Sequence, residues 1–185
     1  LDPAWLGERL RQAGVIGDAE ITALSWEPIG TGQVGDSARI SLTYDRPGAG
    51  PATVAGKFPA ADETSRTTAA TLGLYAKEVG FYRDLRHRVD VRAPVAHVAE
   101  VADNGVDFLL IFEDLGPARG GNQLASCSAA DARAGVTQAA ALHAPSWDNP
   151  AITDLDWLQL PEAVVEHIRG LYGTAQQIFR ERYKD

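Results

Sequence analysis

Cysteine and methionine are nearly missing from this sequence, in which Cys127 is the single cysteine and no residue is methionine. One cysteine excludes an internal disulfide framework and a cysteine-based zinc site. The lack even of an initiator methionine leads us to expect a processed, trimmed or partial product. Long apolar runs are missing too: none approaches the roughly 18 residues of a membrane span, and the N-terminus does not resemble a signal peptide. We therefore expect a cytoplasmic protein with no membrane partner.

Basic residues are outnumbered by acidic ones, 17 against 25, which gives a net charge of −8. Proteins that bind the phosphate backbone of nucleic acids need a basic face, so we expect no nucleic-acid partner. An acidic chain can still bind ATP through a few local cations and backbone amides. Its charge weakly favours neutral or cationic small substrates over anionic ones. The hydrophobic fraction, 45%, is near the average of globular domains, which excludes a disordered chain.

The order of periodic segments predicts an α+β fold. Strand-like composition and alternation occur in five segments, at residues 21–29, 38–44, 52–58, 95–101 and 108–113. A short helix is predicted over residues 4–13, another over about 67–88, and only helices after residue 116. We expect a five-stranded antiparallel sheet with one helix, followed by the beginning of a helical layer. The expected parts are an N-terminal helical segment (1–20), a sheet-containing part (21–115) and a helical part (116–185).

The helical part carries two signals for where its helices begin. Ser128 and Asp131 have the spacing of a capping box, which predicts a helix from there to about His143. Pro161 suits the first residue of the last helix, which has an apolar stripe of helical period. Such a stripe needs a partner surface. We expect the remainder of this helical layer, or a second chain, to cover residues 161–181.

Gly30, Gly32 and Gly35 match the pattern G-x-G-x-x-G. In a dinucleotide-binding fold a helix opens at this loop, so that its amides meet the pyrophosphate. Here an alternating strand follows, and strand–glycine loop–strand is the arrangement that kinases lay over ATP phosphates. Glycine lets backbone N–H groups approach phosphate oxygens with no Cβ in the way. An ordinary glycine-rich hairpin turn is the alternative, because an isolated match to this pattern is a weak signal.

Lys57 and Glu78 form the second candidate pair. Lys57 lies near the end of a predicted strand, where Ala55 shares its face and Val54 and Phe58 point the other way. Glu78 falls on a stripe with Leu74, Phe81 and Leu85, which predicts a carboxylate in the middle of a buried helix face. Such a group is costly unless it is paired, so we expect Glu78 to lie within about 4 Å of Lys57. The alternative is that both side chains are solvated.

Together these residues resemble a known group of enzymes. The chain is similar to the N-terminal half of the aminoglycoside-phosphotransferase and choline-kinase group of the protein-kinase-like fold, and within it to the ecdysteroid-kinase-like branch. The resemblance covers roughly residues 24–150. Its matching segments run from Gly30 to Tyr44, Val54 to Pro59, Leu72 to Tyr82, Leu109 to Leu115 and Leu142 to Trp147.

The resemblance implies a role for each site residue. Lys57 would contact the ATP phosphates and Glu78 would anchor it, with Ser37 at the end of the phosphate loop. Ala55 would lie over the adenine. The carbonyl of Glu113 and the amide of Leu115 would bond the adenine edge, in a hinge between two lobes.

Two departures from the family pattern matter. Gly56 stands where the family has a larger apolar residue, and we expect looser packing behind the lysine. The family's catalytic His-Gly-Asp loop and its metal-binding aspartate are absent, so we expect these residues, and the Mg²⁺ ligands, beyond Asp185.

The expected parent activity is therefore ATP-dependent phosphorylation of a hydroxyl group on a small molecule. The sequence assigns no metal ligand to this chain, and we expect the chain to be inactive alone. A non-catalytic nucleotide-binding or scaffolding module with a degenerate kinase fold is the alternative. A dinucleotide-binding oxidoreductase is a weaker one, since a strand follows Gly35.

Overall fold

The structure is a computed structural model, and it describes residues 1–30, 32, 34–118, 120–122 and 124–184. Its first compact unit, Leu1–Asn149, and its second, Pro150–Asp185, are treated separately. The first unit contains α1 (Pro3–Gln12), β1 (Ile21–Pro28), β2 (Gly35–Tyr44), β3 (Thr53–Pro59), α2 (Glu63–Thr71), α3 (Leu74–Gly80), β4 (Ala96–Val101), β5 (Phe108–Glu113) and α4 (Ala129–Ser146). The compact units divide after α4, whereas the sequence placed a boundary between its expected parts at residue 116.

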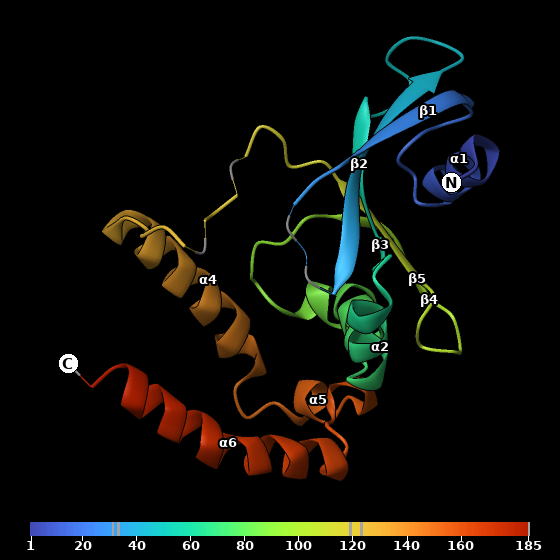
Figure 1. Cartoon of the computed structure of the whole chain (residues 1–185). Helices are drawn as coiled ribbons and strands as arrows, with labels where there is room; N and C mark the ends of the chain where they lie inside the picture. Colours follow the sequence, from blue (N-terminus) through green and yellow to red (C-terminus); the bar gives the residue numbers. More distant parts are fainter. Residues whose placement is uncertain (31, 33, 119, 123, 185) are drawn as a thin grey trace. The chain divides into compact units, whose positions relative to one another are not determined.

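The five strands form one sheet in the order β1-β2-β3-β5-β4 (Figure 1). Every neighbouring pair is antiparallel, so the expected α+β fold with a five-stranded antiparallel sheet is confirmed. The expected strands agree with the observed ones to within a few residues at each end, and β5 has the expected bounds. The main difference is β2, which begins at Gly35 and therefore includes the last glycine of the loop.

Both faces of the sheet are packed, and each has its own apolar cluster. We call the face that carries Ile40 and Val54 the outer face, where α1 contributes Leu6 and Leu10 to the cluster. The face that carries Leu110 and Phe112 is the inner face, where Tyr75 and Val79 of α3 complete the cluster. Figure 1 shows α1, in dark blue, beside β1 and away from α2. The helices thus divide between the two faces.

The single helix expected over residues 67–88 is wrong. The segment begins earlier, because the Asp62 side chain accepts the Ser65 N–H at 2.7 Å and caps α2. It breaks after Leu72, where Gly73 takes a left-handed conformation (φ 64°) that glycine adopts without steric cost. After α3 the chain continues as a π-helix over Phe81–Leu85 and a 3₁₀ turn over Arg86–Arg88. These changes decide which residues face the sheet.

The helix α4 begins as expected, because Ser128 and Asp131 form a complete capping box. It runs to Ser146, past the expected end at His143. Two hydrogen bonds hold α4 to the segment after the 3₁₀ turn: Asp90 N–H donates to the Ala141 carbonyl at 3.2 Å, and Arg92 N–H donates to the Gln138 side chain at 2.7 Å. α4 is therefore tied to the sheet-containing unit.

The second compact unit contains α5 (Pro150–Thr153), a 3₁₀ turn at Asp156–Leu158, and α6 (Glu162–Arg182). Pro161 is the cap that precedes α6 and not its first residue. Large apolar side chains of α6 are exposed: Ile168, Leu171, Tyr172, Ile178 and Phe179. None of the described helices is long and apolar enough to cross a membrane.

Candidate functional site

Lys57 and Glu78 meet at the inner face of the sheet. The Nζ of Lys57 lies 2.6 Å from Oε1 and 2.7 Å from Oε2 of Glu78, so the ammonium is shared by both carboxylate oxygens. The expected pairing is confirmed. Their side chains are 28% and 31% exposed, which leaves the pair half-buried. A half-buried pair is less screened by water than a surface one.

The helix face around Glu78 is rotated from the expected one. Tyr75, Val79 and Gly80 are the buried residues of α3, whereas Leu74, Glu78 and Phe81 are only half-buried. Leu85, the last residue of the expected stripe, is buried as expected, after a π-helical turn from Phe81 that changes the spacing of the residues beyond α3. Glu78 therefore lies at the border of the buried face, from which its carboxylate reaches Lys57 without being fully desolvated.

Strand register places the other predicted residues near Lys57. Ser37 of β2 pairs with Lys57 of β3, and Arg39 pairs with Ala55. Ala55 belongs to the inner cluster and Val54 to the outer one, so the expected division of β3 between two faces is confirmed. Ser37, Ala55 and Lys57 consequently line one face of adjacent strands.

The glycine segment approaches the lysine closely. Gly30 has a φ of 75°, and a Cβ on Gly32 would lie 2.4 Å from the Gly35 carbonyl oxygen, so neither position accepts a larger residue without a backbone change. A Cβ on Gly35 would lie 3.3 Å from Cε of Lys57. Thr31 and Gln33 of the expected loop lie outside the described residues. Gly35 nevertheless brings backbone, rather than a side chain, up to the lysine.

Gly56 does not loosen the packing behind Lys57, contrary to the expectation from the sequence. The ring of Phe58 occupies the space, since a Cβ on Gly56 would lie 2.7 Å from that ring and 3.0 Å from Ile40 Cδ1. Gly56 is itself buried. The outer face therefore compensates for the missing side chain with a neighbouring aromatic one.

The expected hinge begins at the last residue of β5. Glu113 is fixed by the segment before β4: its N–H donates to the Val95 carbonyl at 3.0 Å, and its Oε1 accepts the Val95 N–H at 2.8 Å. Leu115 is exposed. Among the residues that the structure describes, no acceptor bonds the Leu115 N–H. The hinge thus offers one backbone donor, two residues after the end of β5.

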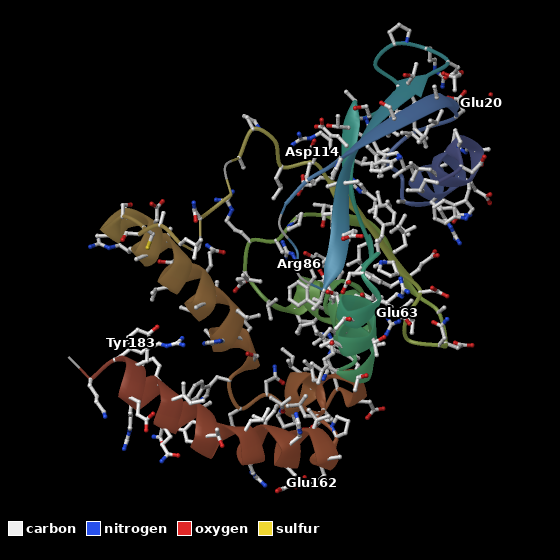
Figure 2. All side chains as sticks on the ribbon, in the orientation of Figure 1. Glu20, Glu63, Arg86, Asp114, Glu162 and Tyr183 are labelled. Atoms are coloured by element: carbon white, nitrogen blue, oxygen red, sulfur yellow. The ribbon has the colours of Figure 1, made fainter. Side chains whose placement is uncertain are left out.

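Asp114, between them, is held tightly and lies beside β2 in Figure 2. Its carboxylate accepts Nε of Arg39 at 2.6 Å and the Gly116 N–H at 3.0 Å, and its side chain is only 11% exposed. The hydrogen bond from Arg39, followed by that from Gly116, lowers the pKa of Asp114 to about 2. Arg39 also reaches Glu27 of β1 at 3.2 Å. Arg39 therefore ties the first strands to the hinge.

Arg39 and Tyr75 are site residues that the sequence did not reveal. Arg39 looked like one of the polar residues that alternate along a half-buried strand, and its partner Asp114 is 75 positions away. Tyr75, described below, bonds the glycine segment 41 positions before it. A buried tyrosine one turn before Glu78 is a local signal for the second, since a buried hydroxyl needs a partner.

A cavity of about 500 Å³ lies on the other side of the glycine segment. It opens on the outer face, opposite Lys57 and Ala55. Its lining is mostly apolar and includes Leu24, Trp26, Pro28, Ala38, Ile40 and Phe58. Four residues expected to bind the nucleotide also line it: Gly30, Gly32, Gly35 and Ser37. Lys57 and Glu78 are not among the described residues that line the cavity, and Gly35 borders both the cavity and the lysine.

Comparisons of the chain with protein-family models, curated proteins and solved structures found no match. The described residues include no group of three or more His, Cys, Asp or Glu side chains arranged to hold a metal ion. The site's own geometry therefore carries the functional argument.

Proposed function

We propose that this chain is the ATP-binding portion of a small-molecule kinase, a phosphotransferase that acts on a hydroxyl group. The observation that carries the proposal is the Lys57–Glu78 pair, at 2.6 Å, directly beside Gly35 at the end of the glycine segment. The helix that bears Glu78 follows the third strand and packs on the inner face, as the resemblance to the aminoglycoside-phosphotransferase and choline-kinase group implies. Within that group, the proposal places the chain in the ecdysteroid-kinase-like branch.

Lys57 and the glycines would bind the phosphates. An ammonium group has three N–H donors, and the two oxygens of Glu78 engage two of them, which leaves one for a phosphate oxygen. The positive charge stays in place because the carboxylate fixes the side chain. Phosphoryl transfer depends mostly on such positioning and on charge stabilisation.

The adenine would lie between Ala55 and the hinge. Ala55 has a small side chain on the same face as Lys57, which leaves room for a flat base. The free N–H of Leu115 and the carbonyl of Glu113 would then bond the adenine edge. Arg39 and Asp114 fix the segment that presents these groups.

Mg²⁺ accompanies ATP in this reaction class, but the described residues do not supply a cluster of ligands for it. We therefore assign no metal-dependent step to this chain. The hydroxyl substrate and the aspartate that would orient it also belong to the proposal for the parent enzyme, in which a further part of the helical layer would cover α6.

A non-catalytic nucleotide-binding module is the second candidate. Such a module would need no catalytic loop, and residues 1–185 contain neither a His-Gly-Asp motif nor an Asp-x-x-x-x-Asn motif. The same inner-face site would bind the nucleotide in both cases.

Calorimetric titration of the chain with ATP and with NADH tests the proposal. We expect heat from ATP and none from NADH, because the strand after Gly35 leaves no helix N-terminus for a dinucleotide pyrophosphate. Binding of NADH without a response to ATP would overturn it.

A further inference from the structure

The buried hydroxyl of Tyr75 connects α3 to the glycine segment. Tyr75 is 1% exposed, and its ring stacks on Phe108 with centroids 4.3 Å apart. Its hydroxyl donates to the Val34 carbonyl at 2.6 Å and accepts the Ala60 N–H at 3.2 Å. Val34 directly precedes Gly35, and Ala60 directly follows β3. One side chain therefore bonds the residue before β2 and the residue after β3.

Tyr75 lies on the same helix as Glu78, the partner of Lys57. Tyr75 and Glu78 lie one turn apart on α3 and point toward the same side of the helix. Glu78 holds Lys57, and Tyr75 holds the backbone that leads into Gly35. Both groups expected to contact phosphate thus depend on the placement of one short helix.

The neighbouring contacts fasten the same end of the segment to the end of β3. Gly35 pairs with Pro59, and Asp36 Oδ2 accepts the Ala61 N–H at 2.8 Å. These contacts join strand to strand. The Tyr75 hydroxyl adds the link to the helix.

We propose that Tyr75 is a positioning residue for the triphosphate: its hydroxyl sets the glycine segment relative to the Lys57–Glu78 pair. This inference rests on the proposed function and deepens it. If α3 moves, the lysine anchor and the phosphate loop are displaced together. The part of the ligand that depends on Tyr75 is the phosphate chain, since the adenine end lies at the hinge.

Tyr75→Phe removes only the hydroxyl and keeps the ring against Phe108. Tyr44→Phe is a matched control, because the Tyr44 hydroxyl donates to the Pro51 carbonyl at 2.9 Å at the β2–β3 connection, away from the glycine segment. Calorimetry of each full chain with ATP and with adenosine separates the phosphates from the base. Loss of a buried hydrogen-bond partner leads us to expect about tenfold weaker ATP binding in Tyr75→Phe and less than about twofold change for adenosine. We expect Tyr44→Phe to change neither.

Amide hydrogen exchange of the unliganded chains provides a second readout. In Tyr75→Phe the Ala60 N–H loses its acceptor, so we expect its exchange to accelerate, together with that of residues 34–36. In Tyr44→Phe these amides should exchange as in the wild type.

Equal weakening of ATP and adenosine, or no weakening of ATP with unchanged exchange, would overturn the inference and leave the nucleotide site in place. If the wild-type chain binds neither ligand, the proposed function fails, and the positioning role fails with it.

Discussion

The two faces of the sheet differ in what they bury. The outer face is apolar: α1 covers part of it, and the cavity of about 500 Å³ opens along β1 and β2. The inner face carries two charged pairs, Lys57 with Glu78 and Arg39 with Asp114, next to an apolar cluster. Hydrophobic burial alone can stabilise a fold, and burying charged groups has a cost. Half-buried charges held by short bonds therefore indicate a functional site more strongly than an apolar hollow does.

The hollow on the outer face is also not the feature whose charged groups suit a nucleotide. The cavity is large, but its lining has mainly apolar side chains, including the 68% exposed Trp26. The inner site has the Lys57 ammonium beside the backbone of Gly35, and the proposal adds the free N–H of Leu115. A triphosphate needs N–H donors and a positive charge, as at the inner site. The following substitutions test whether the outer face stabilises the fold while the inner face binds ATP.

The largest expected effect is on the outer face. Leu6 of α1 is fully buried in the outer cluster. Leu6→Ala should lower the free energy of unfolding by about 2–5 kcal/mol, because it leaves a cavity in the core. The affinity of the folded chain for ATP should stay unchanged. Urea unfolding and calorimetry measure the two effects, with the exposed Leu1→Ala as control. A parallel loss of ATP affinity at full folding would show that the faces are not independent.

The next effect is at the hinge. Arg39 lowers the pKa of Asp114 to about 2, so the carboxylate stabilises the fold above its unfolded pKa of about 3.9, and this contribution is lost as pH falls toward 2. Asp114→Asn should cost about 2 kcal/mol at neutral pH. Its stability should also vary less than that of the wild type between about pH 4 and pH 2.

Acid unfolding followed by circular dichroism tests this. Asp103→Asn, at an exposed turn, is the control. If the two variants have the same pH profile, the Arg39–Asp114 pair does not contribute in the way proposed.

A smaller effect is expected at the lysine anchor. Glu78→Ala frees Lys57 to turn toward solvent, so ATP binding should weaken about tenfold, or roughly 1.4 kcal/mol. The free energy of unfolding should change by less than about 1 kcal/mol, because the pair is partly solvated. Glu63→Ala, at the exposed start of α2 in Figure 2, should alter neither quantity. Identical ATP affinities for the two variants would refute the anchoring role.

The smallest effect is expected at the cavity. Trp26→Ala removes an exposed side chain and should change stability by less than about 0.5 kcal/mol. ATP affinity should not change, since Trp26 lies on the face opposite Lys57. Loss of ATP binding in this variant would place the nucleotide in the outer cavity.

Local patterns predicted much of the fold. Alternation from Ala38 to Tyr44 predicted β2, and the spacing of Ser128 and Asp131 predicted the start of α4. A carboxylate on a helix stripe led to the Lys57–Glu78 pair, because an unpaired charge there would be costly. Each of these signals depends on residues within a few positions of one another, or on a charge that needs a partner.

Other features depend on contacts that local patterns do not encode. The break at Gly73 was missed because an isolated glycine is tolerated within helical patterns. The Arg39–Asp114 pair and the Tyr75–Val34 bond join distant segments whose proximity follows only from strand register and helix placement. Gly56 was read as a packing defect, because the sequence does not show where the ring of Phe58 turns.

The central claim is that ATP binds to the inner face, and two alanine methyl groups test it most directly. Ala55 lies on the inner face beside Lys57, and Ala38 lies on the outer face at the cavity. In NMR spectra of methyl-labelled alanine, ATP should shift the Ala55 signal in a saturable titration and leave the Ala38 signal in place. A saturable shift of Ala38 with Ala55 unmoved would contradict the account.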